Sequence, residues 1–194
     1  MKLIITNLHK SFDEKKLFDG FSYEFSGSGV YALVGESGSG KTTLLRIIAG
    51  LDKDYTGEVT GGGIVSCSIA FQEHRLFPWL TALENVVFSV SDGKDKAVFD
   101  RAIKTLSDLG IEKNDMGLLP DALSGGMKQR ISLARAFISD APILLLDEPT
   151  KELDEANAAL VRERILAEGK KRLVIIATHS AEDIATLEAK VIKF

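Results

Sequence analysis

The sequence predicts an α/β fold in which a phosphate-binding loop joins a buried strand to a helix. The loop is Gly35-Glu36-Ser37-Gly38-Ser39-Gly40-Lys41-Thr42-Thr43, between the apolar run 30–34 and the helical pattern 44–49. Two further runs, 143–146 and 173–177, are apolar throughout, which is typical of parallel strands buried on both faces. With 194 residues, 45% of them hydrophobic, the chain is long enough for one domain with a substantial core.

The loop predicts a site for a nucleotide. Its glycines allow consecutive N–H groups to point into one cavity at a helix N-terminus, where a polyphosphate is stabilised. We expect Lys41 to contact the β- and γ-phosphates and the Thr42 hydroxyl to bind Mg²⁺. A Gly/Ser-rich connector is the weaker interpretation, because the flanking strand and helix are both recognisable. All of 35–43 are therefore predicted nucleotide-binding residues.

The first 25 residues predict an antiparallel pair of strands at the edge of the domain, separated by a charged turn at 13–16. Phe12 lies just before this turn. Two interpretations of its ring stay open on local grounds. It can stack on a purine base, or it can plug the hairpin end as an apolar side chain.

Composition limits the other classes of function. The net charge is −4 with both signs interspersed, so we expect no nucleic-acid partner. The single cysteine, Cys67, lies in an apolar run, which predicts a small buried side chain in a reduced compartment rather than a metal or redox site. No run approaches the about 20 apolar residues of a membrane span, and we expect no signal peptide. A function at a membrane therefore requires another chain.

Residues from about 73 to 130 interrupt the alternation of strands and helices. Thr81 and Glu84 form a capping-box signature before a helix expected to reach Val90, and helical spacing recurs over 95–109. We predict a helical subdomain here, inserted into a nucleotide-binding core formed by 1–72 and 131–194.

A second helix start lies at the end of this insertion. Ser124 is the expected N-cap, and Gly125 and Gly126 would let another group approach the helix N-terminus closely. On local grounds an ordinary capped helix with a glycine hinge is the simpler interpretation.

Polar side chains follow three of the predicted strands. Gln72 follows the strand 64–71 and is placed to contact Mg²⁺ or the attacking water. Asp147 and Glu148 end the strand 143–146, where Asp147 would hold Mg²⁺ and Glu148 would orient or deprotonate the water. His179, after the strand 173–177, can reach a γ-phosphate through a ring N–H. As an isolated residue, Gln72 would by default be an ordinary surface residue, and a lone His is usually structural.

Together these motifs resemble the nucleotide-binding subunit of an ABC (ATP-binding cassette) transporter over nearly the whole chain. The resemblance implies a P-loop NTPase fold of the ABC type, with a RecA-like mixed sheet core, an antiparallel β edge and the inserted helical subdomain. It makes Phe12 the adenine-stacking aromatic. The matching segments are the phosphate loop, Gln72 (Q-loop), Leu123 to Arg130 (signature), Ile143 to Glu148, Leu153-Asp154 (D-loop) and His179 (switch).

The resemblance implies ATP hydrolysis with Mg²⁺ between two chains docked head to tail, either identical copies or paralogues. The signature residues Ser124, Gly125 and Gly126 of one chain would cover the γ-phosphate bound by the other. Asp154 would lie at the dimer interface. The residues implied in catalysis are Lys41, Gln72, Glu148 and His179, and those implied in metal binding are Thr42, Gln72 and Asp147.

The implied partners are integral membrane permease subunits, and in addition an extracytoplasmic solute-binding protein. The chain would then be cytoplasmic and peripheral on the inner face of the cell membrane. Phe77, Pro78 and Trp79 are candidates for the permease contact, and equally for a small core between subdomains.

Within the family, the segments 71–81 and 123–130 look most like importers of nitrate, alkylsulfonates, taurine and related solutes. Two departures exist. Pro149-Thr150-Lys151-Glu152-Leu153-Asp154 stands where those importers usually have Pro-Phe-Ser-Ala-Leu-Asp, and the chain ends where they continue, so no regulatory tail is expected.

Two other functions compete with transport. One is a soluble ABC ATPase of DNA repair or ribosomes, although the sequence shows no coiled-coil insertion, zinc module or second cassette. The other is a switch that binds ATP and hardly hydrolyses it, which the complete motif set disfavours. The sequence does not identify a transported molecule.

Overall fold

The computed structural model describes residues 2–12, 15–61, 63, 67–90 and 95–194. Five parallel strands form the central sheet in the order β5-β6-β7-β3-β8, and three antiparallel strands form a second sheet in the order β2-β1-β4. The parallel strands are β3 (Gly29–Val34), β5 (Cys67–Ala70), β6 (Ile143–Asp147), β7 (Leu173–Ala177) and β8 (Lys190–Lys193). The antiparallel strands are β1 (Lys2–Phe12), β2 (Lys15–Ser26) and β4 (Thr56–Thr60).

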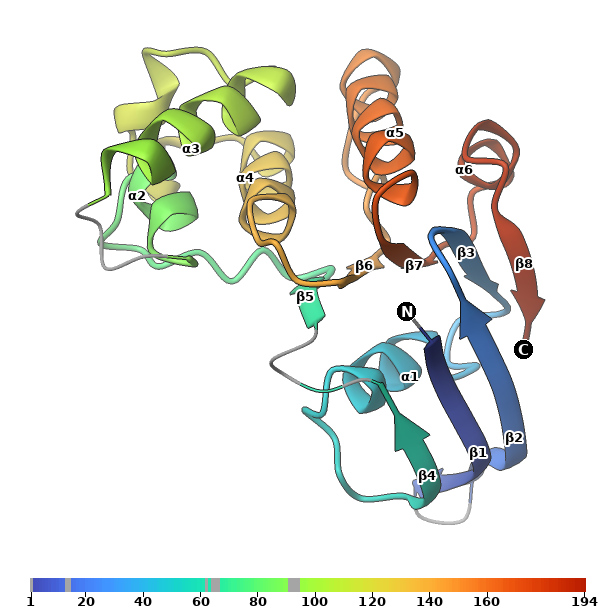
Figure 1. Ribbon diagram of the computed structural model, residues 1–194. Coiled ribbons are helices and arrows are strands. Elements are labelled where there is room, and N and C mark those ends of the chain that lie inside the picture. The colour runs from blue at the N-terminus through green and yellow to red at the C-terminus, as the bar shows by residue number, and fades with distance from the viewer. Residues whose placement is uncertain (1, 13–14, 62, 64–66, 91–94) are drawn as a thin grey trace.

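The helices lie on two sides of the central strands. Figure 1 shows α2, α3 and α4 gathered on one side, with β1, β2 and β4 on the other. The α-helices are α1 (Lys41–Ile48), α2 (Ala82–Val87), α3 (Lys96–Asp108), α4 (Gly125–Phe137), α5 (Glu155–Gly169) and α6 (Ala181–Thr186), and two 3₁₀ turns are Asp115–Gly117 and Pro120–Ala122. Thus α2, α3 and the two turns occupy the segment assigned to a helical subdomain.

Strand β6 is buried on both faces, as its apolar run predicts. Leu144 and Leu146 belong to a core shared with α2 to α5, whereas Ile143 and Leu145 belong to a second core with α1 and the antiparallel strands. Because successive side chains of a strand point to opposite faces, one run of four apolar residues supplies both cores.

The antiparallel edge is confirmed by the pairing of β1 with β2, which runs from Lys2 opposite Ser26 to Phe12 opposite Lys15. Residues 13–14 of the predicted turn and residues 64–66 of the predicted strand lie outside the described residues.

Helix starts agree with the sequence better than helix ends. The capping box at Thr81 and Glu84 is confirmed, but α2 ends at Val87 rather than at Val90. After α2 the backbone forms tighter turns, in which the Val90 N–H donates to the Val87 carbonyl at 3.1 Å, and the Ser89 N–H and hydroxyl both donate to the Val86 carbonyl, at 3.3 Å and 2.7 Å.

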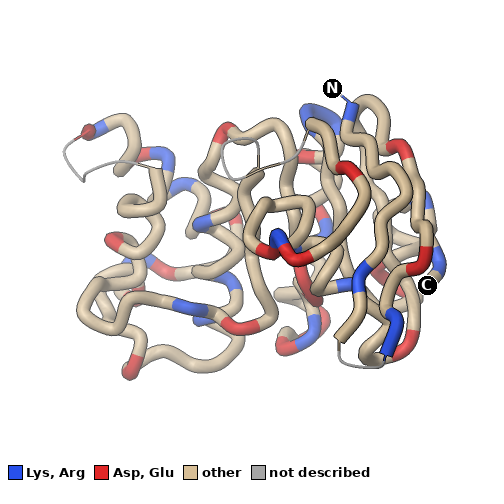
Figure 2. The backbone as a smooth tube through the Cα atoms, turned by 90° about the horizontal axis from the view of Figure 1, so that it is seen from below, with Lys and Arg blue, Asp and Glu red and all other residues tan. Residues whose placement is uncertain are grey.

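Charged positions of both signs are interspersed over the fold, as Figure 2 shows. None of the helices in the described part of the chain combines the length and the apolar character needed to cross a membrane.

Cys67 is half-buried rather than fully buried, and its Sγ lies 3.7 Å from the carbonyl oxygen of Ile48. The reason is its place at the start of β5, a strand at the edge of the parallel sheet. Burial raises the pKa of the Cys67 thiol to about 11.

We predict that Cys67 reacts slowly with a thiol reagent in the folded protein. The shift of the Cys67 pKa from 9.0 to about 11 lowers the thiolate fraction at pH 8 by about 100-fold. Labelling with Ellman's reagent should therefore be at least about 100-fold slower in the native chain than in guanidinium. Equal rates in the two states would contradict the burial of this thiol.

The same shift of the Cys67 pKa makes stability depend on pH. Because the folded state favours the protonated thiol over the thiolate, the contribution of Cys67 to stability is present below pH 9 and is lost between about pH 9 and 11.

Candidate active site

A cavity of about 620 Å³ lies at the carboxyl ends of the parallel strands. All residues predicted to act within one chain line it except Ser39. The lining residues are Gly35, Glu36, Ser37, Gly38, Gly40, Lys41, Thr42 and Thr43 of the phosphate loop, together with Phe12, Lys15, Leu17, Gln72, Asp147, Glu148, Lys151 and His179.

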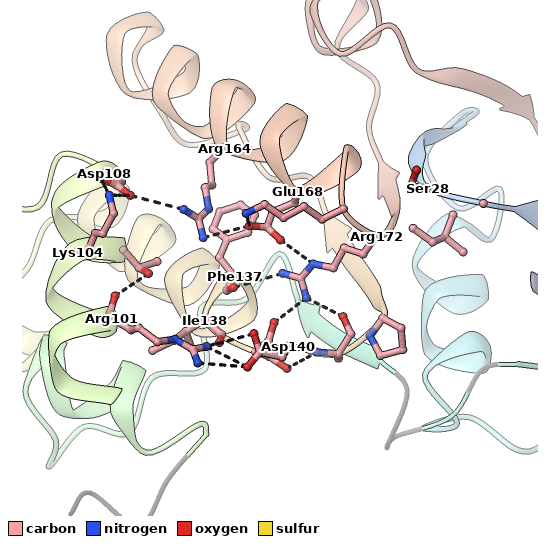
Figure 3. Close-up of a pocket in the computed structure, with 17 residues that line it drawn as sticks. Ser28, Arg101, Lys104, Asp108, Phe137, Ile138, Asp140, Arg164, Glu168 and Arg172 are labelled. Atoms are coloured by element: carbon pink, nitrogen blue, oxygen red, sulfur yellow. Dashed lines mark hydrogen bonds and ion pairs between the residues drawn. The ribbon is translucent and has the colours of Figure 1, made fainter. Parts of the chain in front are cut away.

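A second cavity, also of about 620 Å³, lies at the opposite ends of the strands (Figure 3). Its charged side chains largely neutralise one another, in the ion pairs Arg101–Asp140 (3.2 Å), Arg164–Asp108 (3.5 Å) and Arg172–Glu168 (2.8 Å). The first two pairs join α3 to the segment that precedes β6 and to α5, and the third joins α5 to the residue that precedes β7. Ligands of parallel α/β sheets bind at the carboxyl ends of the strands, so we assign this second cavity a structural role.

The phosphate loop needs glycine at position 40. Gly40 has a φ of 107° at the N-terminus of α1, and a Cβ atom there would lie 2.8 Å from Cζ of Phe18. The Lys41 ammonium donates to the carbonyls of Gly35 at 2.8 Å and Glu36 at 2.9 Å. The loop therefore curls around a positive charge, as a polyphosphate site requires.

Three side chains at this cavity carry oxygen atoms that could bind Mg²⁺. The Thr42 hydroxyl donates to Asp147 Oδ2 at 2.8 Å, and the Gln72 amide lines the same cavity. Asp147 is 4% exposed, and burial raises the pKa of its carboxyl while the Thr42 hydrogen bond lowers it. A bound cation would offset the cost of burying this charge. Hydroxyl, carboxylate and amide oxygens are ligands that Mg²⁺ accepts in proteins.

Glu148 is held in a strained conformation directly after β6. Its φ is 50°, in the left-handed region, which costs about 1–3 kcal/mol for a residue other than glycine. Its N–H donates to the Ala177 carbonyl at 2.8 Å, and its carboxylate lies 2.9 Å from Nδ1 of His179. The predicted base and the predicted switch residue are therefore in direct contact.

Gln129 lies at the site although its residue type and position in the sequence predicted no role for it. It is 2% exposed on α4, and its Nε2 donates to the carbonyls of Glu148 at 3.4 Å and Pro149 at 3.3 Å. The signature helix thus supports the strained backbone of the predicted base. Only its place within the signature could have indicated this.

Lys15 and Lys151 also line the cavity without having been predicted. The Lys15 ammonium donates to the Gly38 carbonyl at 3.3 Å. Both add positive charge where phosphates are expected. An exposed lysine in a charged turn carries no sequence signal of such a role.

Asp183 forms hydrogen bonds with both of the segments that carry Glu148 and His179. Asp183 is fully buried and accepts hydrogen bonds from Thr150 Oγ1 at 2.6 Å, Thr178 Oγ1 at 3.2 Å and Arg162 Nε at 2.8 Å. Hydrogen bonds to Glu155 and then to Asp183 raise the pKa of Arg162. This network holds the segments after β6 and β7 at a fixed separation.

Phe12 lines the cavity and is 51% exposed, so it is not a buried plug of the hairpin. The Lys10 ammonium lies 4.9 Å from the centre of the ring. Stacking of Phe12 on a base stays a prediction.

The signature residues lie outside the cavity. Ser124 caps α4 by accepting a hydrogen bond from the Met127 N–H at 3.3 Å, and Gly125 begins the helix. Asp154 caps α5, and its hydrogen bonds with Asn157 lower the pKa of its carboxyl. The fold of one chain does not bring these residues to its own phosphate loop, and their action on a second chain stays a prediction.

Comparisons with known proteins agree with this geometry. A family described as ABC transporter matches residues 18–151. The aliphatic sulfonates import ATP-binding protein SsuB of Corynebacterium glutamicum is 37% identical over 187 residues, which cover 94% of this chain and 76% of that protein. The protein of the same name from Bacillus subtilis is 39% identical over 175 residues, which cover 81% and 67%.

The fold is also similar to that of solved structures. A dimeric ATP-binding cassette in a post-hydrolysis state, bound to ADP and Pi, has a TM-score of 0.88 and 28% identity. The match covers 99% of this chain and 94% of that chain.

We predict that Asp183→Ala destabilises the protein strongly. It leaves the guanidinium of Arg162 buried without its most buried partner, and such losses cost about 3–5 kcal/mol. Glu155 and Glu182 remain as partners of Arg162, so the lower end is expected. Urea unfolding measures the change. Lys104→Ala, at an exposed pair with Asp108, is the control and should change the free energy of unfolding by less than about 0.5 kcal/mol.

Proposed function

Because the chain belongs to the ABC transporter family, we propose that it is the ATP-hydrolysing subunit of a transporter that imports a small solute. The observation that carries the proposal is that Thr42, Asp147 and Glu148 line the same cavity as the phosphate loop. The similar proteins are named aliphatic sulfonates import ATP-binding proteins, and we infer that this chain serves the same chemical class of solute.

Each residue of the cavity has a distinct task in hydrolysis. The loop N–H groups and Lys41 bind the phosphates, and Thr42, Gln72 and Asp147 would hold Mg²⁺. The bound metal supplies charge stabilisation at the β- and γ-phosphates. Glu148 accepts a hydrogen bond or a proton from the attacking water.

His179 orients this base. Its Nδ1 donates to the Glu148 carboxylate, which leaves Nε2 as an acceptor in the neutral ring and as a donor in the imidazolium. His179 can therefore bind a phosphate oxygen through Nε2 only when the ring is protonated, or after it turns away from Glu148.

A second chain would complete the site. Ser124, Gly125 and Gly126 at the N-terminus of its α4 would cover the open side of the γ-phosphate and exclude water. ATP then binds the closed dimer better than the open one, and hydrolysis removes that preference. This cycle supplies the mechanical step of transport.

We expect Glu148→Gln to separate binding from hydrolysis. The amide keeps the size of the side chain but cannot take a proton, so phosphate release should fall by about 10²–10⁴-fold. Light scattering should show a dimer that persists with Mg-ATP. Lys41→Ala should lose both properties, and the exposed Lys170→Ala should match the parent. Turnover by Glu148→Gln at the parent rate would show that another group is the base.

An exposed aromatic cluster supports a permease partner. Trp79 is 70% exposed and Phe88 is 58% exposed, and their rings lie 5.6 Å and 5.2 Å from that of Phe77. Arg135 lies over the Phe77 ring at 5.4 Å. Such exposure does not fit a core between subdomains, whereas aromatic and arginine side chains are enriched in interfaces. We propose that this surface binds the permease, which would hold the chain on the inner face of the cell membrane.

We predict that Trp79→Ala weakens permease binding and leaves the ATPase activity of the isolated chain unchanged. The tagged Glu148→Gln chain, with Mg-ATP, should co-purify a polytopic membrane protein from detergent-solubilised host membranes, together with a solute-binding protein. Adding Trp79→Ala should reduce this recovery at least about tenfold, as expected for an aromatic hot spot. Val191→Ala, at an exposed apolar residue of β8, is the control. Recovery of ribosomal or DNA-repair proteins alone would contradict the transport function.

A further inference from the structure

The aromatic ring at the candidate active site stands at the end of a strand. Phe12 is the last residue of β1, and it lines the cavity of the phosphate loop with half of its surface exposed. A ring that turns freely loses this freedom when a base stacks on it, and the loss weakens binding. A residue that already holds the Phe12 ring in place therefore improves the binding of a base.

Lys10 is in contact with this ring. Its ammonium lies over the Phe12 ring at 4.9 Å from the centre, where an ammonium is attracted to the negative face of an aromatic ring. Phe12 lines the cavity and Lys10 does not, so the ring lies between the ammonium and the space where a base would stack. Lys10 itself is only 4% exposed.

Three oxygen atoms fix the position of the Lys10 ammonium. It donates to Asp52 Oδ1 at 3.1 Å, to Asp54 Oδ2 at 3.1 Å and to the backbone carbonyl of Asp54. An ammonium has three N–H donors, so each of them has an acceptor here. Asp52 Oδ1 also accepts from the Asp54 N–H at 3.0 Å, which holds the two acids together.

The two acids follow the helix that begins at the phosphate loop. Helix α1 starts at Lys41, and the Asp52 N–H donates to the carbonyl of Arg46 in its last turn at 3.3 Å. Lys10 therefore connects the strand that carries the Phe12 ring to the helix that carries the phosphate loop. Since a base and its phosphates belong to one ligand, this connection sets the separation of the two parts of the site.

We propose that Lys10 is a positioning residue for the base of a nucleotide. It holds the Phe12 ring over its ammonium and at a fixed distance from the phosphate loop. This inference rests on the proposed binding of a nucleotide and on the predicted stacking of Phe12. Lys10 then improves the binding only of ligands that carry a base, because an inorganic phosphate does not reach the ring.

The test compares the binding of Mg-ADP and of Mg-pyrophosphate to the isolated chain by calorimetry. The two ligands differ by the nucleoside, and neither has the γ-phosphate on which the proposed dimerisation depends. Lys10→Met, which keeps the length of the side chain, should weaken ADP binding about tenfold and pyrophosphate binding by less than about twofold. Asp52→Ala removes the shared acceptor and should weaken ADP binding alone, about threefold. Lys53→Ala, exposed between the two acids, is the control and should match the parent.

A mutant cycle shows whether Lys10 acts through the ring. Phe12→Ala should weaken ADP binding about tenfold, as expected for the loss of a stacked base. Lys10→Met combined with Phe12→Ala should lie within about twofold of Phe12→Ala alone, because without the ring the ammonium has nothing to position.

Four results would overturn the inference. Parent-like ADP binding by Lys10→Met would show that the ammonium does not position the ring, and an equal loss of ADP and pyrophosphate binding would show that it supports the phosphate loop instead. A double variant about tenfold weaker than Phe12→Ala would show that Lys10 acts without the ring. Parent-like ADP binding by Phe12→Ala would overturn the stacking prediction as well.

Two further outcomes are kept apart from these. If Lys10→Met does not fold, Asp52→Ala decides the question, and parent-like ADP binding by Asp52→Ala would overturn the inference. A parent chain that binds neither ADP nor pyrophosphate would instead overturn the proposed function, and this inference with it.

Discussion

Burial of the parallel strands on both faces is the constraint on which the site depends. Strands β6 and β7 contact apolar cores on each side, so a polar side chain within either would lose its hydrogen bonds to water. Polar residues can therefore enter only where the strands end. Because the strands are parallel, Asp147 and His179 arrive at the same edge of the sheet as the phosphate loop after β3.

Contacts with neighbouring elements fix the positions of the side chains at this edge of the sheet. Glu148 keeps a left-handed backbone because Gln129 and the Ala177 carbonyl bond its main chain, and His179 bonds its carboxylate. Behind them, Asp183 binds Thr150 and Thr178 in a fully buried network. Strain at the predicted base is thus sustained by packing and hydrogen bonds from α4, α6 and β7.

The segment that follows Gln72 links this edge to the rest of the chain. His74 contacts Glu152 in the segment after β6. The backbone carbonyl of Arg75 accepts a hydrogen bond from the guanidinium of Arg135 on α4 at 2.6 Å. The exposed aromatic cluster around Phe77 follows immediately. A partner bound to that cluster would therefore act on residues only a few positions away from the proposed metal ligand.

Features that depend on neighbours in sequence were predicted well. The capping box at Thr81, the N-cap at Ser124 and the strand at 143–146 are all confirmed, since each is set by local hydrogen bonding or by apolar pattern. The end of α2 was predicted wrongly, because the backbone continues there in tight turns, with the Ser89 hydroxyl also donating to the Val86 carbonyl. The periodicity of apolar residues does not distinguish such a turn from a further turn of α-helix.

The sequence by itself determined the α/β fold class, the phosphate loop and the identity of the residues that end the buried strands. Their motifs are short and their chemistry is carried by residue type. Only the tertiary structure decided which of these residues touch. The contacts of Glu148 with His179, of Gln129 with the main chain at Glu148, and of His74 with Glu152 join distant segments. Their distances depend on how strands and helices pack, which no local pattern contains.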